Sequence, residues 1–173
     1  MHVGDWKLKK KRCVETKETS SKSMPSVTVL MPVYNGAKHI KAALDSLFAQ
    51  TYAGPMAVLV IDDGSTDESM TIVQDFSLKL KKLTSLNSSK SMMTLHILSN
   101  ATNIGISKSL DCGISFVTEQ PDVSRYVARM DADDICHPER IAMQVKRMEQ
   151  LPEIDVSISK ANAVPQNVVC NYR

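Results

Sequence analysis

The stretch Met56-Ala-Val-Leu-Val-Ile-Asp-Asp-Gly-Ser-Thr-Asp67 decides the fold class of this 173-residue chain. Its first six residues form a short apolar run rich in β-branched side chains, which is typical of a strand buried on both faces. Asp62, Asp63 and Gly64 end the run, and Ser65 or Thr66 is a suitable N-cap for a helix over 67–82. The stretch therefore predicts a buried strand, a polar turn and a helix.

The same alternation of strand and helix continues on both sides of this stretch. Upstream and downstream segments show either buried β-branched runs or apolar residues at helical spacing. We expect strands at 26–33, 93–98 and 125–130, helices at 37–50, 106–118 and 138–150, and the start of another strand at 155–158. Alternating strands and helices imply an α/β fold with a Rossmann-like, mostly parallel sheet flanked by helices.

The composition fits one globular domain and names no partner by charge. The chain is 43% hydrophobic and 23% charged, and its formal net charge is +2. Residues 1–25 hold seven Lys and Arg against three Asp and Glu, so we expect a basic, disordered tail without clear nucleic-acid binding. No apolar stretch is long enough for a signal sequence or a transmembrane segment, which predicts a soluble, cytoplasmic protein.

Acidic residues gather where the predicted strands end. Asp62 and Asp63 follow one strand, and Asp131, Asp133 and Asp134 follow another. In open α/β sheets ligands bind beyond the carboxyl ends of the strands, and crowded carboxylates are stabilised by a hard cation such as Mg²⁺ or Mn²⁺. Each acidic turn also has a purely structural interpretation, as an ordinary cap or a solvated loop.

Several other chemistries lack their motifs. The chain has no Gly-x-Gly-x-x-Gly sequence and no phosphate-binding loop with Gly-Lys-Ser/Thr. The glycine and the terminal glutamate of an EF-hand are missing after Asp134. The four histidines are isolated from any nucleophile motif, and the four cysteines have no metal-site or disulfide spacing.

Four short motifs resemble those of the family 2 glycosyltransferases, which have the GT-A fold of nucleotide-diphospho-sugar transferases. They are Val29-Leu-Met-Pro-Val-Tyr-Asn-Gly36, Val60-Ile-Asp-Asp-Gly-Ser-Thr-Asp67, Asn103-Ile-Gly105, and Met130-Asp-Ala-Asp-Asp134 followed by Pro138-Glu-Arg140. Their order and spacing make the resemblance specific, although each motif alone is weak. The resemblance implies a partial donor-binding domain at 26–156, and residues 157–173 form an atypical tail.

The resemblance also implies roles for individual residues. Pro32 and Tyr34 would line the pocket for uracil or another base, with the Tyr34 ring stacking on it, and Asp63 would accept a base N–H. Lys108 matches a region that often contacts the nucleotide or phosphate, although Asp111 stands where the family commonly has Asn.

The strand-end acids match the Asp-x-Asp motif of the family. Asp131 would lie near the ribose or sugar, and Asp133 would be the ligand of a divalent metal, Mn²⁺ or Mg²⁺, that binds the diphosphate. The implied activity is metal-assisted, inverting transfer of a hexosyl group from a nucleotide-diphosphate sugar, with UDP-sugar expected, to an acceptor hydroxyl. The acceptor, whether glycan, lipid or protein, is unknown.

The acids after Asp134 do not match the family's catalytic-base motif, so the catalytic residue is unknown. They are Glu139, Glu149, Glu153 and Asp155. We therefore expect a C-terminally truncated chain that does not transfer sugar alone. The alternative is a non-catalytic nucleotide-sugar-binding or regulatory fragment. A phosphatase using Asp131 and Asp133 is disfavoured, because Ile135 stands where such enzymes usually have a hydroxyl residue.

Overall fold

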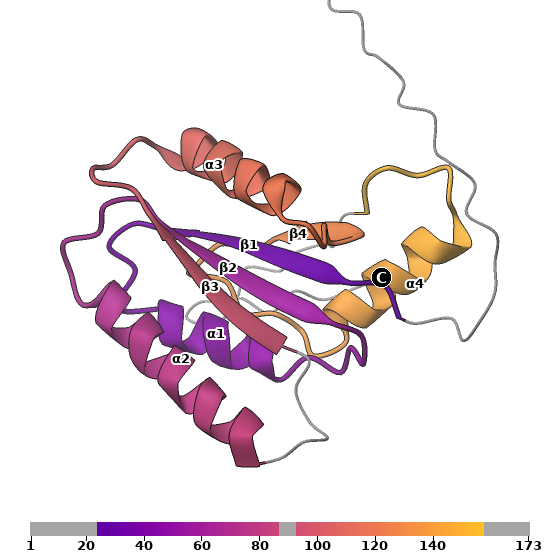
Figure 1. Cartoon of the computed structure of the whole chain (residues 1–173), viewed down its shortest axis with the longest axis horizontal. Coiled ribbons are helices and arrows are strands. Elements are labelled where there is room, and N and C mark those ends of the chain that lie inside the picture. Colours follow the sequence, from indigo (N-terminus) through magenta and orange to yellow (C-terminus); the bar gives the residue numbers. More distant parts are fainter. Residues whose placement is uncertain (1–23, 87–92, 158–173) are drawn as a thin grey trace, which may run out of the picture.

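The computed structural model describes residues 24–86 and 93–157, in which strands and helices alternate (Figure 1). The elements are β1 Val27–Val33, α1 Ile40–Phe48, β2 Met56–Asp62, α2 Ser69–Leu86, β3 Met93–Ser99, α3 Ile106–Glu119, β4 Tyr126–Arg129 and α4 Arg140–Gln150. This order confirms the alternation predicted from the apolar runs. Most of the basic N-terminal segment, and all but the first residue of the 157–173 segment, lie outside the described residues.

The four strands form one parallel sheet in the order β3-β2-β1-β4. Strand β1 lies between β2 and β4. All seven of its residues pair with β2, and residues Val27 to Leu30 pair with β4, where Leu30 is opposite Arg129. All seven residues of β1 are buried, as its continuous apolar run predicts. The predicted α/β class and parallel sheet are confirmed.

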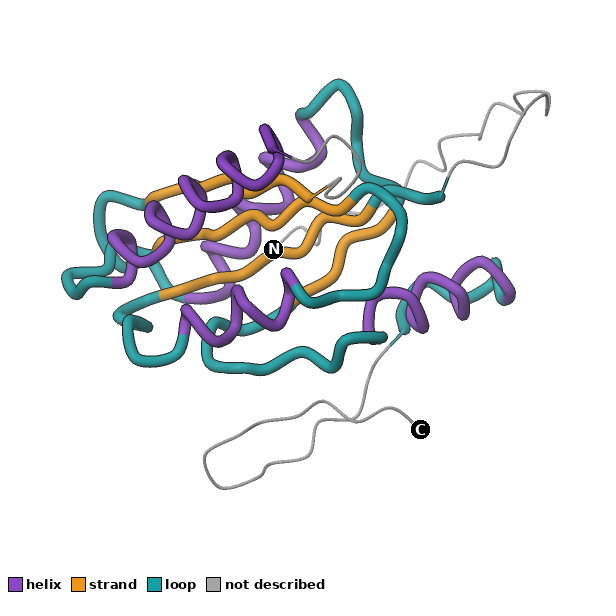
Figure 2. The backbone as a smooth tube through the Cα atoms, turned by 90° about the horizontal axis from the view of Figure 1, so that it is seen from below, coloured by secondary structure: helices purple, strands orange, loops and turns teal. Residues whose placement is uncertain are grey.

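Helices cover the sheet on both faces (Figures 1 and 2). One face packs against α1, α2 and α4 in a core that includes Val29, Leu44 and Ile141. The opposite face packs against α3 through Leu30, Ile61 and Val117. Burial of these side chains contributes about 1.5–3 kcal/mol for each large aliphatic group, so the two faces hold the strand ends in fixed positions.

Two local predictions are wrong for identifiable reasons. Ser65 and Thr66 do not cap α2, because the Asp67 carboxylate accepts the N–H of Ser69 at 2.9 Å. Residues 155–157 of the expected further strand are not in a strand, since the Ser157 carbonyl accepts a hydrogen bond from Gln144 of α4 at 3.3 Å. Ile158 of that expected strand lies outside the described residues.

The strand order creates a topological switch beside β1. The chain moves from β1 to β2 to β3 in one direction, and then crosses to add β4 on the other side of β1. Crevices at such switch points, beyond the carboxyl ends of the strands, are the usual ligand sites of open α/β sheets.

In the part of the chain that the structure describes, no helix is long and apolar enough to cross a membrane.

Candidate functional site

The loops after the four strands lie along one edge of the sheet, because all four strands run in the same direction. Tyr34 follows β1 and Asp131 follows β4, so these two residues flank the switch point. Asp63 follows β2, which is the neighbour of β1 on its other side. Adjacent strands are about 4.8 Å apart, so the sheet brings together residues that the sequence separates by almost 100 positions.

Asp63 is the buried anchor of the loop after β3. Its side chain is only 4% exposed. Oδ1 accepts hydrogen bonds from the Asn100 side chain and the Ile104 N–H, both at 2.9 Å, and Oδ2 accepts the Gly105 N–H at 2.8 Å. An ionised carboxylate has about four acceptor sites. The Ser109 side chain is a further donor to this carboxylate, so four protein groups hold it.

These hydrogen bonds control the charge of Asp63. Burial by itself raises the pKa of the carboxyl, but the hydrogen bonds from Ile104, Asn100, Ser109 and Gly105 outweigh it and leave the pKa below its ordinary value. Hydrogen bonds to the charged form favour that form. Asp63 is thus a fixed negative charge beneath the 100–105 loop at neutral pH.

The lowered pKa of Asp63 predicts a pH-dependent stability. In the unfolded chain the carboxyl titrates near its ordinary pKa of about 3.9, so the unfolded state binds this proton first as pH falls. The stabilisation is complete above that value and is lost as pH falls through the lower folded pKa. Unfolding titrations from pH 6 to 2.5 should show the stability gap between the natural chain and Asp63→Asn narrowing below pH 4. A constant gap would contradict the prediction.

A second hydrogen-bond network joins the loops after β1 and β2. The Asn35 side chain accepts the Thr66 N–H at 2.8 Å, and the Asn35 N–H donates to Ser65 Oγ at 3.0 Å. Asp67 Oδ2 accepts the Ala37 N–H at 3.0 Å. Asn35 has a φ of +50°, in the left-handed region that Asn tolerates better than most residues. This network fixes the backbone on which Tyr34 is carried.

Gly64 allows the loop after β2 to approach the loop after β3. Its φ is +75°, and a Cβ there would lie 2.7 Å from the Thr102 carbonyl carbon. We expect Gly64→Ala to lower the free energy of unfolding by about 2 kcal/mol, because backbone cannot move aside as a flexible side chain can. Denaturant unfolding measures this effect. Gly105→Ala is the control for backbone strain alone, since a Cβ at Gly105 has nothing within 4 Å; an equal loss in both variants would contradict the close approach.

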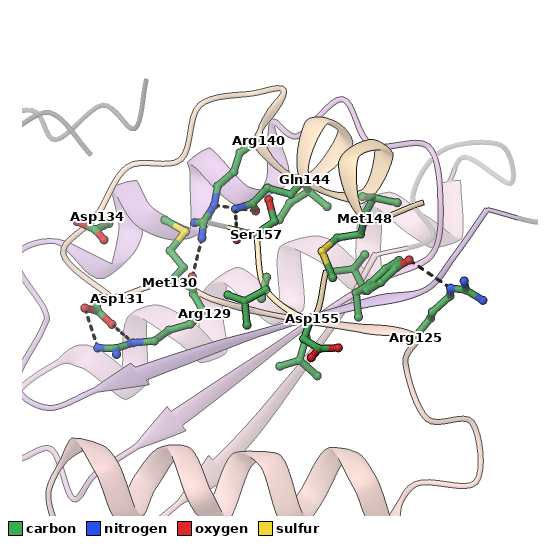
Figure 3. A pocket seen from close by; sticks show the side chains of 17 residues that line it. Arg125, Arg129, Met130, Asp131, Asp134, Arg140, Gln144, Met148, Asp155 and Ser157 are labelled. Carbon is green, nitrogen blue, oxygen red and sulfur yellow. Dashed lines mark hydrogen bonds and ion pairs between the residues drawn. The ribbon is translucent and has the colours of Figure 1, made fainter. Parts of the chain in front are cut away.

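The turn after β4 carries three carboxylates in different environments, and Figure 3 shows two of them, Asp131 and Asp134. Asp131 accepts two hydrogen bonds from Arg129, at 3.0 Å from Nε and 3.2 Å from Nη2. Asp133 is exposed and makes no hydrogen bond or ion pair with any residue that the structure describes. Burial, followed by repulsion from Asp133 and Asp131, raises the pKa of Asp134, although Arg140 and Arg129 oppose this.

The acidic turn is held by residues that the sequence analysis did not single out. Arg140, at the start of α4, donates to the Arg129 carbonyl at 2.7 Å. Gln50, after α1, donates to the His137 carbonyl at 2.7 Å and accepts the Ile141 N–H at 3.0 Å. Arg140 is part of the Pro138-Glu-Arg140 motif, so the sequence contained a signal that could have pointed to it. Gln50 had none, because its partners are about 90 positions away.

The six predicted site residues lie on the same edge without binding one another. Pro32 is buried within β1, whereas Tyr34 is 52% exposed just beyond it, and Lys108 is exposed in the first turn of α3. Asp63 is tied to the 100–105 loop, and Asp131 is paired with Arg129. No hydrogen bond or ion pair connects any two of these six described residues.

A cavity of about 630 Å³ lies between β4 and α4 (Figure 3). Its lining includes Arg125, Arg129, Asp131 and Arg140, together with residues 155–157. Of the six predicted site residues it contains only Asp131. The cavity follows the outer side of β4, which no described strand pairs with, and its lining reaches the acidic turn at Asp131 and Asp134.

The carboxylates after β4 are suited to a divalent cation that also binds a phosphate ligand, rather than to a cation that is coordinated by protein groups alone. Among the described residues, no three or more His, Cys, Asp or Glu side chains are placed to bind one ion together. Mg²⁺ in phosphate-binding sites characteristically takes one or two carboxylates and completes its shell with phosphate oxygens and water. The exposed, unpaired carboxylate of Asp133 is suited to that arrangement.

Comparison with known families identifies the family of the chain. Residues 28–168 match the family described as glycosyl transferase family 2. The chain belongs to glycosyl transferase family 2. An uncharacterised glycosyltransferase of Rickettsia prowazekii is 30% identical over 134 residues, and the amylovoran biosynthesis glycosyltransferase AmsE of Erwinia amylovora is 34% identical over 132 residues. These matches cover 78% and 75% of this chain, but 35% and 43% of the relatives.

Solved structures of glycosyltransferases share the GT-A fold of this chain. A Staphylococcus aureus TarS fragment in complex with UDP-GlcNAc is 23% identical, with a TM-score of 0.57 over 72% of this chain and 31% of that one. The mannosyltransferase PcManGT of Pyrobaculum calidifontis, in complex with GDP-Man and Mn²⁺, is also 23% identical, with a TM-score of 0.57 over 78% and 34%. The family and the fold predicted from the motifs are confirmed.

Proposed function

We propose that this family 2 chain binds a nucleotide-diphosphate sugar, with UDP-sugar the expected donor, along the carboxyl edge of its sheet. The observation that carries the proposal is the placement of Tyr34, Asp63, Asp131 and Asp133 beyond the ends of β1, β2 and β4, on both sides of the switch point. A nucleotide needs a flat surface for its base, an acceptor for a base N–H and a cation for its diphosphate. In this proposal Tyr34 provides the flat surface, Asp63 the acceptor and Asp133 the ligand of the cation.

Each residue has a chemical task in this proposal. The half-exposed Tyr34 ring stacks on the base, and such stacking contributes about 1–3 kcal/mol. Asp63, the fixed negative charge at the end of β2, is the acceptor for a base N–H. Pro32 closes the base pocket, Lys108 contacts a phosphate, and Asp131 accepts a ribose or sugar hydroxyl.

Asp133 is the residue that would hold the divalent cation. When bound, Mn²⁺ or Mg²⁺ neutralises the negative charge that develops on the departing diphosphate. The Mn²⁺ in the PcManGT complex supports this role, and the two donors in the neighbouring structures, UDP-GlcNAc and GDP-Man, are the natural candidates to test. We further propose that the sugar passes to an acceptor hydroxyl with inversion, as a hexosyl transfer.

The extent of activity in this chain is a separate proposal. The chain spans about a third of the length of the first curated relatives it matches. We propose that it provides donor binding and that the catalytic base belongs to the acceptor-binding part of such enzymes. A mixture of the purified chain, a UDP-sugar and candidate acceptors should then yield no transfer product, and any transfer would contradict this proposal.

Calorimetric titration tests the donor site directly. UDP, GDP, UDP-GlcNAc and GDP-Man are added to the purified chain with Mn²⁺ and, separately, with a chelator. We expect saturable binding of at least one nucleotide, with clear dependence on Mn²⁺ and loss of affinity in Tyr34→Ala. The control is Phe48→Ala, which removes a similarly exposed aromatic ring on α1, away from the edge. Failure of every nucleotide to bind under both conditions would refute the donor site.

A further inference from the structure

Arg129 pairs with the acidic turn through its side chain and has no part in the proposed donor site. It is the last residue of β4, two positions before Asp131. Its Nε and Nη2 atoms donate separately to the two carboxylate oxygens of Asp131, at 3.0 and 3.2 Å (Figure 3). This is the bidentate geometry that makes arginine a stronger partner for carboxylates than lysine.

The backbone of Arg129 is fixed independently of its side chain. Its position in β4 is set by pairing with Leu30 of β1, and its carbonyl accepts a hydrogen bond from Arg140 at 2.7 Å. The side chain itself is 54% exposed. The guanidinium is therefore delivered to Asp131 by a rigid element, and its removal would leave the strand in place.

The ion pair divides the carboxylates of the turn into two kinds. Both oxygens of Asp131 are occupied and its charge is balanced, whereas Asp133 is exposed and unpaired among the described residues. A divalent cation approaching Asp131 would meet the repulsion of the positive guanidinium, which lies 3.0 and 3.2 Å from the two oxygens of Asp131, whereas Asp133 has no cationic partner among the described residues.

We propose that Arg129 is a positioning residue that keeps Asp131 from coordinating the divalent cation and so leaves cation binding to Asp133. Asp131 is thereby held in one orientation, with lone pairs still available for a sugar or ribose hydroxyl. This inference rests on the proposed donor site and adds to it a residue that selects which carboxylate binds the cation. It concerns affinity for the cation, so it can be tested without any transfer reaction.

The test is a set of Mn²⁺ titrations of the full chain without nucleotide, read by the loss of the free-ion electron paramagnetic resonance signal. Arg129→Gln should bind Mn²⁺ about tenfold more tightly than the natural chain, because Asp131 is then free to coordinate the cation together with Asp133. Adding Asp131→Asn to Arg129→Gln should cancel that gain. Arg129→Lys keeps the charge but cannot form the bidentate pair, so its Mn²⁺ affinity should fall between those of the natural chain and Arg129→Gln.

Arg125→Gln is the matched control. Arg125 also forms an ion pair with a carboxylate, through a single contact with Glu149 at 3.0 Å, and lies four residues before Arg129. Four residues of extended strand span about 13 Å, beyond the Debye length of about 10 Å in 0.1 M salt. Its loss should leave Mn²⁺ affinity unchanged. Equal unfolding midpoints among the variants would show that all of them are folded.

The outcomes separate this inference from the donor site. If the natural chain binds Mn²⁺ but Arg129→Gln behaves like Arg125→Gln, the role of Arg129 is refuted and the metal site stands. A gain that survives Asp131→Asn is a simple charge effect and also refutes it. If neither the natural chain nor any variant binds Mn²⁺, alone or with UDP or GDP, the metal part of the proposed function fails together with the inference.

Discussion

Asp63→Ala should lower the free energy of unfolding by about 3 kcal/mol, because it leaves up to three partly buried donors without their acceptor, at the lower end of roughly 1–3 kcal/mol each. Those donors are the Ile104 and Gly105 N–H groups and the Asn100 side chain. A domain of this size is stable by about 5–15 kcal/mol, so the variant would be close to unfolding. Equilibrium denaturation followed by circular dichroism measures the loss.

Asp63→Asn keeps this prediction measurable if the alanine variant does not fold. The amide retains one oxygen but places an NH₂ group where another acceptor is needed, so we expect a loss of about 2 kcal/mol. Asp45→Asn is the control, because Asp45 is an exposed aspartate paired with Lys41 one helical turn away. Exposed pairs of this kind contribute about 0.3–0.5 kcal/mol. Equal losses at Asp63 and Asp45 would contradict the anchoring role of Asp63.

Asp133→Asn should weaken Mn²⁺-dependent UDP binding about fiftyfold, within the range seen when a metal site loses one of its supporting groups. The physical reason is that the amide has no negative charge to hold the cation against the diphosphate. UDP binding measured with a chelator should be the same in the natural chain and the variant. Calorimetry under both conditions therefore assigns the loss to the cation.

Asp122→Asn provides the comparison for this effect. Asp122 is an exposed aspartate before the amino end of β4, whereas Asp133 follows its carboxyl end, and Asp122 has no hydrogen bond or ion pair among the described residues. The same change in charge at that position should alter Mn²⁺-dependent binding less than twofold, because the site is several strand residues away. If Asp133→Asn retains full metal dependence, another group binds the cation.

The strands and helices could be predicted because each one is encoded by neighbouring residues. The apolar run Met56–Ile61 places β2 to within one residue of its end, and the helical spacing of Leu110, Ile114 and Val117 places α3. The cap of α2 was predicted wrongly for the opposite reason. Ser65 and Thr66 have the right chemistry for a cap, but Asn35 of a different loop engages both of them.

The residue types of the candidate site could also be predicted, but their environments could not. The motifs placed Tyr34, Asp63, Asp131 and Asp133 at strand ends without showing that Asp63 is buried under Ile104 and Gly105. They did not show that Arg129 occupies both oxygens of Asp131, or that Gln50 holds the segment before α4. A hydrogen bond between distant residues leaves no periodic trace in a single sequence.

The sequence by itself determined the alternation of strands and helices, the family and the acids at the strand ends, because apolar periodicity and short motifs are local properties of the chain. Only the tertiary structure decided the strand order β3-β2-β1-β4, and with it the switch point between Tyr34 and Asp131. It also decided which carboxylate is anchored, which is paired and which is exposed. Those differences arise from burial and from contacts between loops, which exist only after the strands have been brought side by side.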